Sequence, residues 1–170
     1  MNKPTNLEQT VLRFSDINHT ELINLLARYQ LKVQITPSGN AIPGSFWGDE
    51  EAGLIDHHIF LRQDTPIHSV LHEACHFICM DDVRRKQLNT NAGNFQLEEN
   101  AVCYLQILLA DDLPSLGRQR MLFDMDAWGY SFRLGSTRSW FEQDAQESRD
   151  WLLAHDLIDK SNRSTYQLRL

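Results

Sequence analysis

One helix constrains this chain more than any other feature of its sequence. Asp64, Thr65 and Pro66 form a start signal, because a capping residue followed by proline at the first helical position favours a helix. The apolar residues that follow recur at helical spacing, namely Ile67, Val70, Leu71, Ala74, Phe77 and Ile78. We therefore predict an amphipathic helix from Pro66 to about Met80.

This helix carries two histidines four positions apart, His72 and His76, with Glu73 directly after the first. Residues at this spacing share one face of a helix, so both imidazoles can bind a single ion. Zinc suits imidazole ligands, and a catalytic zinc site keeps one position open for water. The pattern HExxH therefore predicts a hydrolase with a Zn²⁺ cofactor, in which Glu73 is the catalytic base that takes a proton from that water.

A tetrahedral site with one open position needs a third ligand from the protein, and the sequence offers Glu98, Glu99 and Asp82. A second helix is predicted from about Gln96 to Ala110. On that helix Glu98 shares its face with an apolar wall, whereas Glu99 shares its face with the polar Gln106. We therefore expect Glu98 to point inward as the third metal ligand, with Glu99 and Asp82 as the alternatives.

The rest of the chain predicts a small sheet and further helices. We expect a helix over 20–29, a short strand over 31–35, and a second strand or hairpin over 54–62. Residues 83–96 are polar and predict a loop or short helix, while residues 136–158 predict one long amphipathic helix. The expected fold is α+β, with a small, mostly antiparallel sheet packed on the two metal-bearing helices.

Length and composition limit the classes of function. A chain of 170 residues suits one domain, so we expect a single domain over 1–170. Sixteen Lys and Arg against 23 Asp and Glu leave a formal net charge of −7, which disfavours nucleic acid and anionic membranes as partners. The sequence has no stretch of roughly 20 apolar residues and no signal sequence, so we expect a cytoplasmic protein. Cys75, Cys79 and Cys103 fall in apolar helical patterns and are expected in the core, without disulfides.

The motif and the second helix together resemble a known peptidase clan. HExxH followed by Glu98-Glu99-Asn100-Ala101 looks like a gluzincin, whose third ligand opens an ExxA or ExxxD helix. The run from His58 to His76 more closely resembles the small metallopeptidases that cleave repressors of mobile elements, and the likeness covers about residues 54–114. It implies a zincin-like minimal metallopeptidase domain with a peptide or protein substrate, although shifting the alignment by one residue promotes Glu99. The ligands that it implies are His72, His76 and Glu98.

Several points stay open at the level of sequence. Asp82 lies where the metzincin pattern places its third ligand, but that pattern needs a glycine-type turn at the position of Cys79. A catalytically silent regulatory or interaction protein that kept the metal site is the main alternative to an enzyme. Peptide hydrolysis also needs a hydrogen-bond donor for the oxyanion. The chemically capable residues are Tyr130, Arg133, Arg138 and His155.

Overall fold

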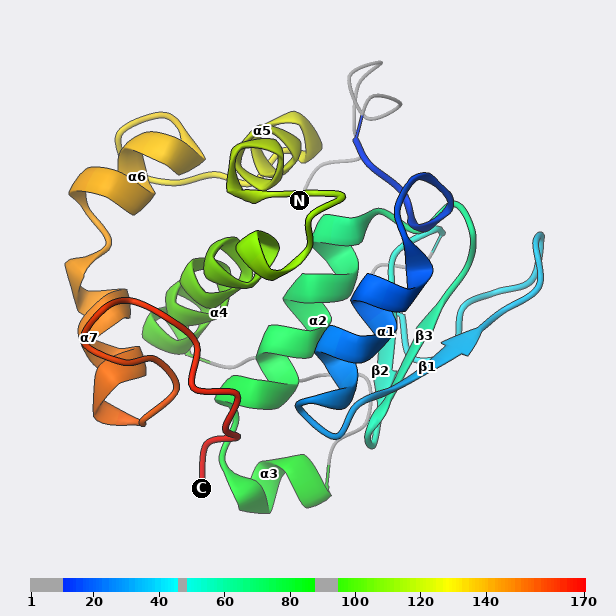
Figure 1. Ribbon diagram of the computed structural model, residues 1–170, viewed down its shortest axis with the longest axis horizontal. Coiled ribbons are helices and arrows are strands. Elements are labelled where there is room, and N and C mark those ends of the chain that lie inside the picture. Colours follow the sequence, from blue (N-terminus) through cyan, green and yellow to red (C-terminus); the bar gives the residue numbers. More distant parts are fainter. Residues whose placement is uncertain (1–10, 46–48, 88–94) are drawn as a thin grey trace.

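A three-stranded sheet and seven α-helices make up the described part of the computed structural model, which covers residues 11–45, 49–87 and 95–170 (Figure 1). The strands are β1 (Lys32–Ile35), β2 (Gly53–Ile55) and β3 (His58–Leu61). β3 lies in the middle, parallel to β1 and antiparallel to β2. The predicted α+β class is confirmed, but the expectation of a mostly antiparallel sheet is wrong, because the sheet has one pairing of each kind.

Strands β2 and β3 form a hairpin, one of the two alternatives predicted for residues 54–62. Its turn consists of Asp56 and His57, and Asp56 adopts a positive φ of 55°, a conformation that Asp tolerates better than most residues. The strand β3 alternates: Ile59 and Leu61 are fully buried, whereas His58 and Phe60 are only partly covered. The sheet therefore presents one apolar face to the helices.

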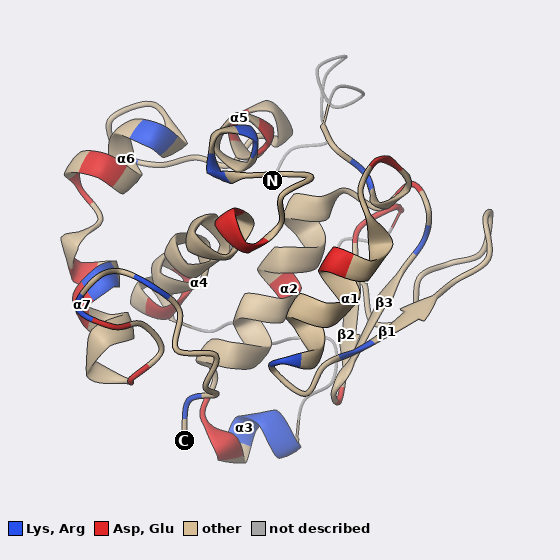
Figure 2. Ribbon diagram, in the orientation of Figure 1, with Lys and Arg blue, Asp and Glu red and all other residues tan. Residues whose placement is uncertain are grey.

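The central helix is α2 (Ile67–Cys79), which contacts β2 and β3 on one side and α4 (Gln96–Leu109) on the other (Figure 1). Eleven of its 13 residues are buried, so it is an interior helix rather than a surface one. Glu73 is its one acidic residue, and it has no Lys or Arg, so α2 is almost uncharged in Figure 2. Both predicted metal-bearing helices thus exist and pack together.

The remaining helices cover this pair and include one that the sequence did not predict. They are α1 (His19–Ala27), α3 (Asp82–Lys86), α5 (Arg118–Trp128), α6 (Thr137–Gln143), α7 (Gln146–Ala154) and two short 3₁₀ turns, η2 (Phe14–Asp16) and η3 (Ala110–Asp112). Helix α5 has a weak amphipathic pattern, and two glycines with positive φ, Gly117 and Gly129, bound it. The single helix predicted over 136–158 is wrong: the chain breaks at Asp144, whose carboxylate pairs with Arg133.

The end of the chain returns to the C-terminal end of α2. The backbone N–H of Arg169 donates to the carbonyl of Ile78 at 3.1 Å, and its guanidinium donates to the carbonyl of Cys79 at 3.2 Å. The buried guanidinium of Arg85 in α3 donates to the carbonyl of Phe77 at 2.8 Å and also to the carbonyl of Arg169. These arginines satisfy carbonyls that a helix end leaves without intrahelical partners.

All three cysteines are buried in α2 and α4, as predicted, and they are free thiols. In the ranges of the chain that are described, no helix combines the length and the apolar character that crossing a bilayer requires.

Substitution of Leu105 tests how much the packing of the interior helices contributes to the free energy of unfolding. Leu105 is fully buried in α4, so Leu105→Ala is expected to lower the free energy of unfolding by about 2–5 kcal/mol through lost burial and a cavity. Urea denaturation followed by circular dichroism measures the change. Ile23→Ala is the control, because Ile23 is 41% exposed on α1 and its loss is expected to cost less than about 0.5 kcal/mol. Equal losses in both variants would contradict the assignment of α4 to the core.

Candidate metal centre

Three ligand atoms from α2 and α4 converge on one point between the helices. The Nε2 atoms of His72 and His76 lie 3.1 Å apart. One oxygen of the Glu99 carboxylate lies 2.9 Å from His72 Nε2, and the other lies 3.1 Å from His76 Nε2. Together the three side chains form a His/Glu group that can hold a metal ion.

The geometry of this group fits a small tetrahedral ion. Nitrogen and oxygen ligands lie about 2.0–2.2 Å from zinc, so two ligands of one tetrahedral ion are separated by about 3.3 Å. The two Nε2 atoms are separated by 3.1 Å, and they lie 2.9 and 3.1 Å from the two different oxygens of Glu99, which is close to that value. The carboxylate is ionised: burial alone raises the pKa of Glu99, but the hydrogen bonds from His72 and His76 outweigh it and hold this pKa well below its usual value.

A buried glutamine determines which nitrogen of His72 faces the centre. The amide nitrogen of Gln106 donates to the carbonyl of His68 at 3.0 Å, so its oxygen, Oε1, points the other way, 2.9 Å from His72 Nδ1. An amide oxygen only accepts hydrogen bonds, hence Nδ1 of His72 carries the proton and donates. Nε2, which donates to Glu99 here, is therefore the nitrogen whose lone pair a metal would take once that proton leaves, the arrangement that outer partners of metal-binding histidines commonly enforce.

Glu98, the residue expected as the third ligand, lies outside this group, because its carboxylate is engaged elsewhere. Glu98 is buried, as predicted, but both of its oxygens accept from the guanidinium of Arg84, at 2.6 and 2.8 Å. Arg169 adds a third contact at 3.2 Å. Neighbouring residues on a helix point about 100° apart, so the turn that directs Glu98 toward the arginines directs Glu99 toward the histidines.

The other ligand candidates also lie outside the centre. Asp82 is exposed on α3, where it pairs with Lys86 at 2.7 Å. Cys79 ends α2 without the positive-φ turn that the metzincin pattern requires, and Met80 follows it in an extended conformation. The side chain that contacts Nδ1 of His72 is that of Gln106 and not an aspartate, while Asp81 accepts from the backbone N–H of Arg84 and Asp124 accepts from Arg120.

Glu73 lies next to the metal centre on α2 and is partly buried. Burial raises the pKa of its carboxyl group, while the charges of His76 and His72 act in the opposite direction. No hydrogen bond or ion pair connects its side chain to another residue in the described part of the chain. Glu73 is thus a carboxyl group with a raised pKa, and it has no structural partner among these residues.

Tyr130 is the one predicted oxyanion donor that lies at the centre. Its ring packs edge-on against His72, with 5.8 Å between the ring centroids, and its hydroxyl lies 3.2 Å from Nδ1 of His68. The other three are engaged away from it: Arg133 with Asp144, Arg138 with Gln119 and Glu142, and His155 with the carbonyl of Trp151.

Sequence reasoning missed Glu51, a buried carboxyl group near Glu73. Burial raises the pKa of Glu51, and the charge of Glu73 raises it further, while the indole N–H of Trp128 donates to Glu51 at 2.9 Å. Glu51 precedes β2 in a segment rich in turn-forming residues, where an acidic residue ordinarily lies at the surface. No pattern in the sequence distinguishes it from the acidic residues that precede it, Asp49 and Glu50.

Substitution of Glu98 and of Glu99 separates metal binding from stability. Glu99→Gln removes a charged ligand, so zinc affinity measured by competition with a chromogenic chelator is expected to fall at least about tenfold. Glu98→Gln leaves the ligands in place but breaks the pairing with Arg84 and Arg169, so it is expected to lower the free energy of unfolding by about 3 kcal/mol while zinc binding persists. Loss of zinc in a folded Glu98→Gln variant, with zinc retained in Glu99→Gln, would refute the assignment.

Substitution of Gln106 tests the orienting hydrogen bond. Gln106→Met keeps a similar volume but removes the acceptor for His72 Nδ1, so zinc affinity is expected to fall about 10–100-fold. The same competition assay measures it, with Gln96→Met, at an exposed position on α4, as the matched control. An unchanged affinity in Gln106→Met would show that the histidine is oriented without this bond.

Known proteins provide no independent assignment of this site. Comparisons with models of protein families, with curated proteins and with solved structures found no match to this chain. What the site can do therefore follows from its own geometry.

Proposed function

We propose that this protein is a zinc-dependent hydrolase of the metallopeptidase type. The observation that carries the proposal is the position of Glu73, a carboxyl group without a partner among the described residues, beside the group formed by His72, His76 and Glu99. A site that only stabilises structure usually has four protein ligands, whereas three ligands and an adjacent carboxylate suit a hydrolytic site. The same donor set supports zinc, since two imidazoles and one carboxylate match its preferences.

Zinc and Glu73 have different roles in the proposed reaction. When bound, zinc supplies Lewis acidity, which polarises a carbonyl group and lowers the pKa of a water molecule to about 7. In this proposal Glu73 accepts the proton of the attacking water and passes it to the leaving amine. Its raised pKa helps, because an acid–base group is most effective when its pKa is near the working pH.

Tyr130 supports hydrolysis as the donor to the developing oxyanion. Burial lowers the pKa of His68 to about 3, so this imidazole is neutral and has one N–H. Its Nε2 is buried without a hydrogen-bond partner, and an unpaired lone pair is less costly there than an unpaired N–H. The proton therefore belongs on Nδ1, which donates to the Tyr130 oxygen. The hydroxyl proton of Tyr130 remains available to a substrate.

A peptide or protein is the substrate that this proposal favours. The likeness of residues 54–114 to small metallopeptidases and the combination of base, metal ligands and hydroxyl donor both support cleavage of an amide bond. The competing proposal is a regulatory protein that binds metal without turnover.

Glu73→Gln tests the proposal, because it removes the base and leaves the metal ligands. Zinc-loaded protein is incubated with a complex mixture of peptides, and new termini are identified by mass spectrometry. The wild type is expected to cleave peptides, and Glu73→Gln is expected to be at least about 100-fold slower with unchanged zinc content. Glu142→Gln, at an exposed position on α6, is the control. Cleavage that survives Glu73→Gln would show that Glu73 is not the base, whereas the absence of cleavage by the zinc-loaded wild type would favour the regulatory alternative.

A further inference from the structure

The turn between β2 and β3 presents a second group of potential metal ligands, distant in the sequence from the centre at α2 and α4. It consists of three consecutive residues, Asp56, His57 and His58. The carboxylate of Asp56 lies 2.9 Å from Nδ1 of His57. One ligand atom from each of the three side chains lies within 4.8 Å of the other two.

The turn, and not the strand, brings the two imidazoles together. Consecutive side chains in a strand point to opposite faces, so neighbouring histidines ordinarily diverge. His57 belongs to the turn that Asp56 opens with a positive φ, and His58 is the first residue of β3. Their rings consequently pack against each other, with centroids 4.2 Å apart.

The three side chains are accessible to a metal ion from solvent. The side chains of His57 and Asp56 are 39% and 67% exposed, and His58 is partly exposed. Ligand atoms within 4.8 Å need only small side-chain rotations to reach the separation of about 3.3 Å in a tetrahedral site. Partly exposed side chains make such rotations easily.

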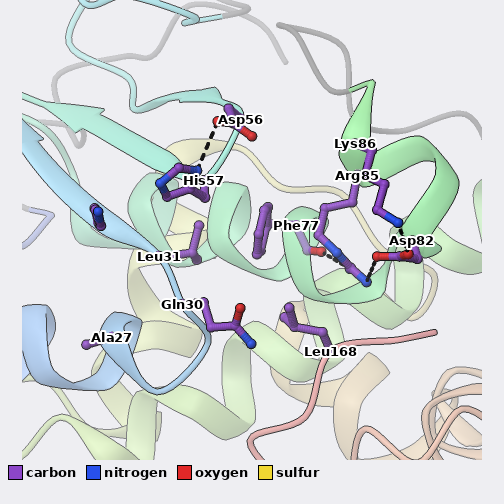
Figure 3. Close-up of a pocket in the computed structure, with 11 residues that line it drawn as sticks. Ala27, Gln30, Leu31, Asp56, His57, Phe77, Asp82, Arg85, Lys86 and Leu168 are labelled. Carbon is purple, nitrogen blue, oxygen red and sulfur yellow. Dashed lines mark hydrogen bonds and ion pairs between the residues drawn. The ribbon is translucent and has the colours of Figure 1, made fainter.

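This group also borders a cavity of about 590 Å³ (Figure 3). Asp56 and His57 line one side of it, Leu31 and Phe77 form part of its apolar wall, and Lys86 of α3 lies toward the opposite side. The ligands of the interior centre, His72, His76 and Glu99, are not among the residues that line this cavity. This cavity therefore borders the group at the turn and not the interior centre.

We propose that Asp56, His57 and His58 form a second, exchangeable site for a divalent ion of the zinc class. Two imidazoles and one carboxylate are the ligands that such ions prefer, and a three-residue set leaves coordination positions open. Because the carboxylate and one imidazole line the cavity, a small ligand with a donor atom can complete the coordination from within it. This site does not depend on the hydrolase activity proposed above.

The number of zinc ions bound at saturation tests the second site. Isothermal titration with zinc is compared between the wild type and the double variant His57→Ala/His58→Ala, with circular dichroism as the check on folding. The wild type is expected to bind one equivalent more than the double variant. Asp82→Asn is the matched control, because Asp82 is an exposed carboxylate that lines the same cavity, and its zinc stoichiometry is expected to equal that of the wild type.

Two further measurements keep the outcome independent of the interior centre. In His76→Ala, which removes an interior ligand, the equivalent bound at the turn is expected to persist even if the proposed hydrolase fails. In the wild type, the NMR signals of the His57 and His58 imidazoles are expected to shift as zinc is added beyond the first equivalent. Equal stoichiometry in the wild type and the double variant, or imidazole signals that do not move up to saturation, would overturn the proposal.

Discussion

The contact between α2 and α4 is the interaction on which the rest of this structure depends. Each helix buries an apolar surface against the other, and within that surface the two helices enclose polar atoms of His72, His76, Glu99 and Gln106. An unpaired polar group costs free energy when it is buried, so the hydrogen bonds among these side chains constrain how the helices can be placed. The positions of the site residues therefore depend on the packing of the core.

A second polar group supports the first from the adjacent side of α4. Glu98 is buried with the guanidinium groups of Arg84 and Arg169, which come from α3 and from the end of the chain. The same Arg169 contacts the last turn of α2, so one residue connects both helices that carry the candidate ligands. Because Glu98 and Glu99 are consecutive, the ion pairs of the first fix the direction of the second.

Glu98 is buried as expected, yet the structure groups Glu99 and not Glu98 with the two histidines. The polar Gln106 on the face of Glu99 suggested that this face is exposed, but Gln106 is fully buried and its amide groups are paired inside. A helix covered on nearly every side carries no reliable distinction between an apolar face and a polar face. A polar residue in such a helix marks a buried polar site as readily as it marks a solvent boundary.

The sequence by itself determined the two central helices, the hairpin region and the pair His72 and His76 beside Glu73, because helical periodicity and i, i+4 spacing are local properties of the chain. Only the tertiary structure decided that Glu99 joins the two histidines, that Gln106 orients His72, and where Tyr130 and Glu51 lie, because these depend on contacts between distant segments. The mixed sheet and the break between α6 and α7 were also decided by the tertiary structure. Strand partners and long-range ion pairs are chosen by how the whole chain packs, and no local pattern records that choice.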